Sequence, residues 1–233
     1  MHLSVIIPAY NEVDRIGRTL QAVADYLKHE KYEFEIIVID DGSTDGTEAY
    51  VRHMAENIHT ISLTRLPKNQ GKGAAVKAGM LAATGTIRLF MDADGSTNIH
   101  ELKKLLPYLD KGFDIAVGSR LVTGAVKQQK QHLSREFLGW IFRRLVGFIV
   151  PIDIEDPQNG FKLFTKSAAE IIFTGLTTNG WSFDVETLVL ARKFRLKVKE
   201  VPIVWVNDAR SKLRFSHMIR MLIDLVRIRQ RYG

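Results

Sequence analysis

The sequence has 233 residues, of which 45% are hydrophobic, and a formal net charge of +7. This length suits one domain with a sizeable core, and the absence of cysteine excludes a disulfide framework or a thiolate site. No run of about 18 uncharged apolar residues and no basic segment followed by an apolar one is present, which argues against a membrane-spanning helix and a signal peptide. The positive charge favours anionic partners such as nucleotides, phosphates, nucleic acid or an acidic membrane.

In chain order, apolar runs alternate with amphipathic segments up to residue 120. The runs typical of buried strands are residues 3–9, 34–39, 60–63, 86–91 and 113–117. The segments typical of helices are residues 12–27, 44–56, 73–83 and 99–109. This alternation predicts an α/β fold with a mainly parallel sheet flanked by helices. After Arg120, irregular and amphipathic segments begin without a linker or a repeat, so we expect a single domain of residues 1–233.

Polar clusters mark the ends of three predicted strands. Residues 8–12 end the first strand, residues 40–43 follow the second, and Asp92 and Asp94 follow the fourth. Because ligands bind at the carboxyl edge of an open α/β sheet, we expect these clusters to share one site. Paired carboxylates suit Mg²⁺ or Mn²⁺ ions that share their coordination shell with phosphates. The alternative interpretation, three separate Asx-rich turns, requires a coincidence.

Two familiar nucleotide-binding loops are absent from the sequence. No Gly-x-Gly-x-x-Gly opens the first predicted helix, and Asn-Gln-Gly-Lys-Gly at residues 69–73 lacks the P-loop spacing. These absences argue against a dehydrogenase and against a P-loop NTPase. A nucleic-acid binder could use the basic surface, but the sequence lacks an aromatic-basic motif and that function leaves the aspartate pair unexplained. We therefore expect no nucleic-acid partner.

The combination of these motifs resembles a known enzyme family. Four segments resemble the family 2 inverting glycosyltransferases of the GT-A fold, namely residues 8–12, 40–47, 69–73 and 92–94. Four more are similar to the polyprenyl-phosphate sugar synthases, namely residues 118–120, 156–162, 181–186 and 211–213. Within that group, the motifs Asp-Ala-Asp-Gly-Ser and Phe-Asp-Val-Glu look closest to the dolichyl-phosphate β-glucosyltransferases, and the mannose synthases come next.

The resemblance implies a GT-A, Rossmann-like fold in which residues 1–120 bind a nucleotide sugar and residues 121–233 bind an acceptor. The residues that would line the nucleoside pocket are Pro8, Tyr10, Glu12, Ile39 and Asp41. Lys72 would contact phosphate, and the segment Asp92, Ala93 and Asp94 would bind Mg²⁺ or Mn²⁺ and the donor diphosphate, with both aspartates as metal ligands. Ordinary alternatives are a helix start for Glu12 and a solvated lysine for Lys72.

The resemblance also implies how the acceptor is bound. The candidates for its phosphate are Arg120, Arg135, Ser211 and Lys212, each of which could also be an ordinary surface residue. The residues with expected catalytic roles are Asp94, Arg120, Asp156 and Asp184. Asp156 and Asp184 would orient the phosphate or the sugar hydroxyls, and for an acceptor with a neutral hydroxyl one of them would be the base. Asp156 also suits a turn before Pro157.

The implied reaction is a metal-dependent, inverting transfer of a sugar, with glucose favoured, from a UDP-sugar to a dolichyl or undecaprenyl phosphate. An acceptor that is already anionic needs no strong base, so catalysis would depend on positioning and charge stabilisation. One alternative is a mannose synthase that uses GDP-mannose, but those enzymes carry an arginine where this chain has Val206. Another is a family 2 transferase with a non-lipid acceptor. The absence of a Gln-x-x-Arg-Trp motif argues against polymerisation.

Two basic amphipathic segments, residues 133–150 and 215–228, are typical of helices that lie in a bilayer interface. The alternative is that both pack on the core, which is common for amphipathic helices. Because the implied acceptor is a lipid, we expect a peripheral protein on the cytoplasmic face of a membrane.

Overall fold

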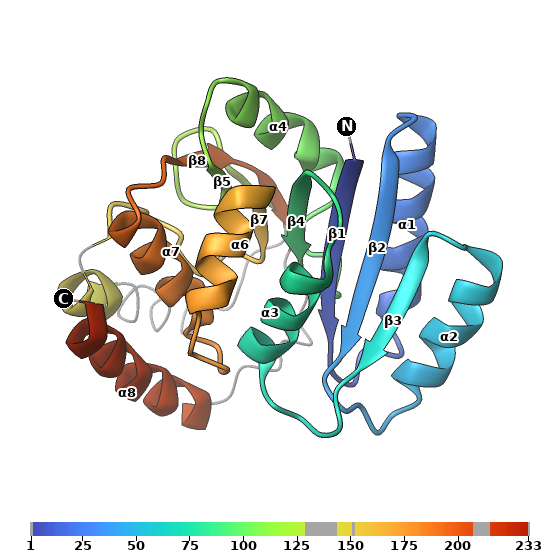
Figure 1. The fold of residues 1–233 in the computed structure, drawn as a ribbon, viewed down its shortest axis with the longest axis horizontal. Helices are drawn as coiled ribbons and strands as arrows, with labels where there is room; N and C mark the ends of the chain where they lie inside the picture. Colours follow the sequence, from blue (N-terminus) through green and yellow to red (C-terminus); the bar gives the residue numbers. More distant parts are fainter. Residues whose placement is uncertain (1, 129–143, 151, 207–214, 233) are drawn as a thin grey trace.

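The structure is a computed structural model that describes residues 2–128, 144–150, 152–206 and 215–232. Within these ranges one sheet has the strand order β3-β2-β1-β4-β7-β5-β8 (Figure 1). Its strands are β1 His2–Ala9, β2 Glu33–Asp40, β3 Ile61–Arg65, β4 Ile87–Met91, β5 Ile115–Ser119, β7 Phe161–Thr165 and β8 Val198–Pro202. Every pairing is parallel except those of β7, which runs antiparallel to β4 and β5. The expected mainly parallel α/β fold is confirmed.

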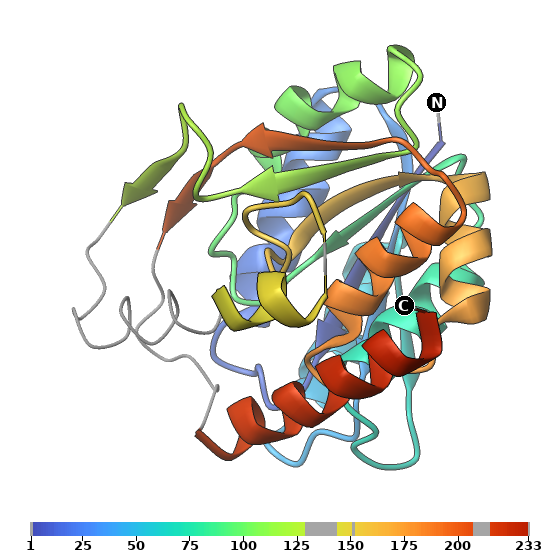
Figure 2. The ribbon, with the colours of Figure 1, turned by 90° about the vertical axis from the view of Figure 1, so that its left-hand side faces the viewer.

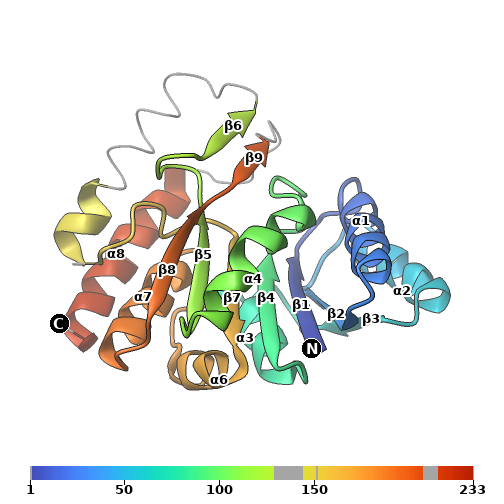
Figure 3. The same cartoon turned by 90° about the horizontal axis from the view of Figure 1, so that it is seen from above.

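Helices cover both faces of this sheet. Among the described residues, the helices are α1 Ile16–His29, α2 Thr47–Asn57, α3 Lys72–Ala82, η1 Ile99–Glu101, α4 Leu102–Asp110, α6 Lys166–Gly175, α7 Phe183–Lys193 and α8 Phe215–Tyr232, together with a short helical segment at residues 144–149. Side chains alternate across β1: Leu3, Val5 and Ile7 pack with α1, α2 and α4, whereas Ile6 packs with α3, α6 and α7 on the opposite face (Figure 3). The sheet is therefore buried on both sides, as the long apolar strands of the sequence indicate.

The predicted elements differ from the structure mainly at their ends. The first helix begins at Ile16 instead of residue 12, because residues 12–15 form a turn in which the carbonyl of Glu12 accepts from the amides of Arg15 and Ile16. The helix predicted at 99–109 opens with a 3₁₀ turn, η1, and the Asn98 side chain accepts from the amide of His100. Strands β7 and β8 were not predicted; both lie after residue 120, where the regular alternation of strand-like and helix-like segments ends.

A second, smaller sheet pairs β6, Val126–Gln128, with β9, Val204–Val206 (Figure 2). The amide of Val206 donates to the carbonyl of Ser96, 2.8 Å away. The amide of Val204 donates to the carboxylate of the buried Glu101, 3.1 Å away. These bonds hold β9 against the segment that follows β4. The small sheet therefore lies next to the carboxyl end of β4 in the large sheet.

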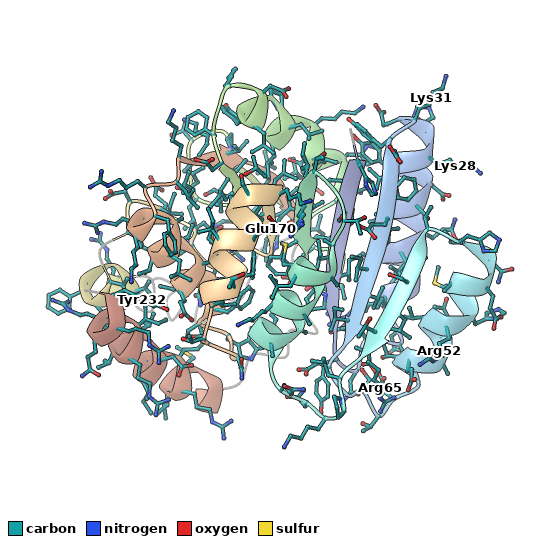
Figure 4. All side chains as sticks on the ribbon, in the orientation of Figure 1. Lys28, Lys31, Arg52, Arg65, Glu170 and Tyr232 are labelled. Carbon is teal, nitrogen blue, oxygen red and sulfur yellow. The ribbon has the colours of Figure 1, made fainter. Side chains whose placement is uncertain are left out.

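Helix α8 lies on α7, away from the sheet (Figure 3). One of its apolar stripes, Met221, Leu225 and Ile228, is buried against Val185 and the helical segment 144–149. At its end, the hydroxyl of Tyr232 donates to the carboxylate of Glu186, 2.8 Å away; Tyr232 is labelled in Figure 4. Among the helices that the structure describes, none is long and apolar enough to cross a membrane.

Candidate active site

The two aspartates of the Asp-Ala-Asp segment stand directly after β4, at the carboxyl edge of the sheet. The amide of Asp92 donates to the carbonyl of Gly160, 3.0 Å away, and an Asp94 oxygen accepts from the amide of Ser96 at 2.9 Å. A Cβ placed on Gly160 would lie 1.9 Å from an Asp92 carboxylate oxygen. Only glycine at position 160 therefore leaves room for the Asp92 carboxylate in this orientation.

These two carboxylates have the chemistry of a site for a hard divalent cation. Burial raises the pKa of Asp94 above its usual range, and the neighbouring carboxylate of Asp92 raises it further. Residues 2–128, 144–150, 152–206 and 215–232 hold no cluster of three or more His, Cys, Asp or Glu side chains that would suit a metal ion. An ion held by Asp92 and Asp94 alone would complete its shell with water and diphosphate oxygens, which is the usual habit of Mg²⁺. The residues thus fit the predicted Mg²⁺ or Mn²⁺.

Lys72, the first residue of α3, faces this aspartate pair. Its ammonium lies 2.6 Å from an Asp92 oxygen and 5.3 Å and 5.1 Å from the ring centroids of Phe90 and Trp181. Burial lowers the pKa of Lys72, but the carboxylates of Asp92 and Asp184 outweigh it and raise that pKa above its usual value. Lys72 is therefore a charged side chain that is largely enclosed by the site, and it is not the solvated surface lysine of the alternative interpretation.

The residues predicted for the nucleoside pocket lie together at the ends of β1 and β2. Pro8 and Ile39 are register partners on these strands and are both buried, whereas Tyr10 is 39% exposed. The carboxylate of Glu12 forms an ion pair with the guanidinium of Arg15. Their role in nucleoside binding remains a prediction.

Asp41 already has protein partners in the structure. Its two oxygens accept from the amides of Gln70 and Gly71, at 2.7 Å and 2.9 Å. Burial raises the pKa of Asp41, and the neighbouring Asp40 raises it further. Asp41 therefore fixes the loop that leads to Lys72, in addition to any contact with a nucleoside.

On the acceptor side, Arg120 and Asp156 form one bidentate ion pair. The Arg120 Nε and Nη2 atoms each lie 2.7 Å from an Asp156 oxygen, and the Arg120 amide donates to the same carboxylate at 2.9 Å. The guanidinium also lies over the ring of Trp205, 5.2 Å from its centroid. Burial alone would raise the pKa of Asp156, but Arg120 holds it below its usual value. Arg135, Ser211 and Lys212 lie outside the described residues.

Lys162 is a site residue that the sequence analysis did not select. It belongs to β7, is fully buried, and pairs with the carboxylate of Asp184 in the first turn of α7. Its ammonium also donates to the carbonyl of Asn159, 2.6 Å away. Burial lowers the pKa of Lys162 more than Asp184 raises it. A lysine inside the apolar run Phe-Lys-Leu-Phe was the available signal.

The site as a whole is an alternating cluster of charges. Its members are the cations Lys72, Arg120 and Lys162 and the carboxylates Asp92, Asp94, Asp156 and Asp184. The cluster has one more carboxylate than it has cations, so its formal charge is −1 when all seven groups are ionised. A divalent cation would reverse the sign of that balance.

Comparison with known proteins gives consistent matches over the whole chain. A family model described as Glycosyl transferase family 2 matches residues 4–173. A dolichyl-phosphate beta-glucosyltransferase of Trichomonas vaginalis is 38% identical over 240 residues, covering 98% of this chain and 73% of the relative. That of Saccharomyces cerevisiae is 37% identical over 250 residues, covering 99% and 75%.

Among solved structures, glucosyl-3-phosphoglycerate synthase from Mycobacterium tuberculosis, in complex with Mn²⁺, uridine-diphosphate-glucose and phosphoglyceric acid, is similar in fold. The match has a TM-score of 0.72 at 19% identity and covers 100% of this chain and 80% of that one. At this identity the likeness concerns the fold alone.

Proposed function

The chain belongs to glycosyl transferase family 2, and from this premise we propose that it transfers glucose from UDP-glucose to a polyprenyl phosphate such as dolichyl phosphate, with inversion at the anomeric carbon. Relatives named for glucose transfer to dolichyl phosphate match nearly the full chain. The neighbour that was solved with UDP-glucose and Mn²⁺ shares the fold, so this fold is compatible with such a donor and a divalent ion.

The proposed acceptor, a lipid phosphate, is chosen because both candidate bases, Asp156 and Asp184, are already paired with cations. A neutral hydroxyl needs a general base, and Asp156 and Asp184 are the candidates in the described site. Asp156 is engaged in a bidentate pair with Arg120, which lowers its pKa, and Asp184 is paired with the buried Lys162. With its pKa lowered, Asp156 is a poor proton acceptor, and the Lys162 ammonium occupies the Asp184 carboxylate, so the site favours an acceptor oxygen that is already anionic. A lipid phosphate meets that requirement.

Each side chain then has a defined role. Asp92 and Asp94 would hold the Mg²⁺ or Mn²⁺ ion, which, when bound, neutralises charge on the leaving nucleoside diphosphate. The Lys72 ammonium adds a positive charge on the same side. Arg120, whose side chain is 25% exposed, presents its guanidinium to the acceptor phosphate while Asp156 fixes its plane. The acceptor oxygen attacks the anomeric carbon opposite the diphosphate, so the protein supplies orientation and charge balance.

Transfer assays with purified protein test this function. UDP-glucose and GDP-mannose are each offered with a polyprenyl phosphate, in Mg²⁺, in Mn²⁺ and in chelator. We expect transfer from UDP-glucose only with a divalent ion, and loss of transfer in Asp94→Asn with the circular dichroism spectrum preserved. Transfer to a soluble glycoside but not to the lipid phosphate would contradict the acceptor. Tighter calorimetric binding of GDP than of UDP would contradict the donor.

We also propose that α8 faces an anionic membrane surface on the cytoplasmic side. A chain without cysteine is compatible with that reducing compartment. Besides its buried stripe, α8 exposes a second apolar stripe, Ile219, Ile223 and Val226, each about half exposed at 50%, 48% and 45%. In the adjoining segment 144–149, Phe148 is 82% exposed. Exposed arginines, including Arg220 and Arg227, flank the stripe. One stripe of α8 therefore packs on the core, and the exposed second stripe supports the proposed membrane surface.

Vesicle flotation tests the membrane surface. The double variant Ile219→Asp/Ile223→Asp should lose binding to anionic vesicles, because it replaces apolar contact with charge. Ile171→Asp on α6, which is 41% exposed, is the matched control and should bind as wild type does. Wild-type binding should weaken as salt rises without vanishing, since salt screens only the arginines. Equal flotation of the double variant and the control would refute this surface.

A further inference from the structure

Two residues with separate expected partners are bonded to each other in this structure. Asp92 is expected to bind the metal ion and Lys72 to bind phosphate, yet the ammonium lies 2.6 Å from the Asp92 carboxylate. The lysine side chain is 16% exposed and that of the aspartate 33%. The ion and the lysine therefore require the same carboxylate.

The position of Lys72 makes this contact replaceable. It is the first residue of α3, where the helix dipole is positive, so a cation there is unfavourable unless an anion faces it. In the structure that anion is Asp92. A diphosphate close to the Lys72 ammonium would serve better, because it carries more negative charge than a single carboxylate.

The main chain around Lys72 is fixed, so only its side chain has freedom to turn. A Cβ on Gly71 would lie 2.4 Å from the carbonyl oxygen of Asn179, and one on Gly73 would lie 2.4 Å from that of Thr178. The amide of Ala74 also donates to the carbonyl of Asn179, 3.2 Å away. The start of α3 is thus packed directly against the loop before α7 and cannot retreat from the site.

Aromatic rings beside the Lys72 ammonium stabilise its charge independently of Asp92. Besides Phe90 and Trp181, the ring of Phe183 lies 6.0 Å from the Lys72 nitrogen. Cation–π attraction to such rings does not depend on the Asp92 contact. The ammonium can therefore leave Asp92 without losing every favourable contact.

We propose that Lys72 is a stand-in cation: it neutralises Asp92 in the ion-free protein and turns to the donor diphosphate when ion and donor bind together. This rests on the proposed metal-dependent binding of a nucleotide sugar. It follows that Lys72 weakens binding of the ion alone, because it competes for Asp92. It also follows that nucleotide strengthens ion binding, because a diphosphate removes the competitor, and linkage makes this effect reciprocal.

Lys72→Met tests the exchange, since methionine keeps an unbranched side chain beside the rings and removes the charge. Calorimetry and Mn²⁺ electron paramagnetic resonance measure Mn²⁺ binding with and without UDP. We expect the variant to bind Mn²⁺ alone at least about fivefold more tightly, and to bind UDP in saturating Mn²⁺ at least about fivefold more weakly. The strengthening of Mn²⁺ binding by UDP should shrink accordingly.

Three controls make the result specific. Lys72→Arg keeps a cation and should retain weak Mn²⁺ binding. Lys72→Gln repeats the neutral substitution should the methionine variant not fold. Lys68→Met removes an exposed positive charge from the preceding loop, so it measures the long-range effect of charge alone and should leave Mn²⁺ affinity within about twofold of wild type.

The outcomes separate this inference from the proposed function. If wild type binds both Mn²⁺ and UDP and the neutral variants leave the affinity for Mn²⁺ alone unchanged or weaker, the exchange is wrong and the proposed function stands. If wild type binds neither Mn²⁺ nor UDP, both are wrong. An equal gain of Mn²⁺ affinity in Lys68→Met would also overturn the exchange, since a general charge effect would then account for it.

Discussion

Replacing Arg120 by alanine should destabilise the protein more than removing the charge of its partner. Asp156 is 1% exposed and accepts three hydrogen bonds from Arg120, two from the guanidinium and one from the amide. Arg120→Ala removes both guanidinium bonds and leaves a buried carboxylate without its cation. Asp156→Asn keeps an acceptor for the Arg120 amide and leaves a guanidinium that is 25% exposed and can reach water.

The magnitudes follow from this asymmetry. Removing one partner of a buried ion pair costs about 3–5 kcal/mol, and two charge-assisted hydrogen bonds at about 1.5–3 kcal/mol each give a similar figure. For a chain of this size, Arg120→Ala should lower Tm by roughly 6–20 °C. Asp156→Asn should cost only about 1–3 kcal/mol. The double variant should cost less than the sum by about 0.5–3 kcal/mol, because the two side chains share one interaction.

Urea unfolding, followed by circular dichroism at neutral pH, measures these differences. The matched control is Arg52→Ala on α2, whose pair with Glu48 is on the surface, with the Arg52 side chain 60% exposed (Figure 4). That pair should contribute at most about 1 kcal/mol. The argument is refuted if Arg120→Ala costs no more than the control, or no more than Asp156→Asn. Any loss of transfer activity in Arg120→Ala must then be measured at a temperature where the variant is folded.

Two further predictions concern the aspartate segment and acid stability. Gly160→Ala should weaken Mn²⁺-dependent UDP binding in calorimetry at least about tenfold, because the added Cβ displaces the Asp92 carboxylate. The control is Gly175→Ala, whose Cβ would meet nothing closer than 3.8 Å and which should bind UDP as wild type does. Equal UDP binding by both variants would refute the steric argument. Burial opposes ionisation of Glu186, but hydrogen bonds from two threonines and Tyr232 outweigh it and hold the pKa of Glu186 below its usual value. The ionised carboxylate therefore stabilises the folded protein fully above about pH 4.3, and this stabilisation is lost as pH falls through the pKa of Glu186 in the folded protein. In urea titrations, Glu186→Gln should therefore be less stable than wild type at pH 7 and should lose less stability than wild type between about pH 5 and 3. An equal loss of unfolding free energy in both proteins over this pH range would contradict the argument.

The sequence alone predicted the sheet edge at which the site lies. The strands that end at Ala9, Asp40 and Met91 are apolar runs followed by polar clusters, so both the strand and its carboxyl end were readable. Because these strands are parallel, their ends meet at one edge. The approximate positions of Asp41, Asp92 and Lys72 follow from that rule without any knowledge of side-chain contacts.

What could not be predicted are contacts that depend on tertiary packing. Strand β7 is five residues long, and its antiparallel insertion between β4 and β5 has no local signal. Without β7, neither the burial of Lys162 nor its pairing with Asp184 can be inferred. The Lys72–Asp92 pair is also invisible in sequence, since it joins the start of a helix to the end of a strand 20 residues later.

The insertion of β7 also imposes an order on biosynthesis. When β4 and β5 have left the ribosome, neither has yet received the strand that lies between them, since β7 begins 70 residues after β4 ends. Until then the free side of β4 presents unpaired backbone groups, an open edge that invites association with other chains. The carbonyl of Gly160 that fixes Asp92 arrives together with β7. The nascent polypeptide must therefore pass through a stage at which the donor-side motifs are already synthesised but the metal-binding segment is still without its support.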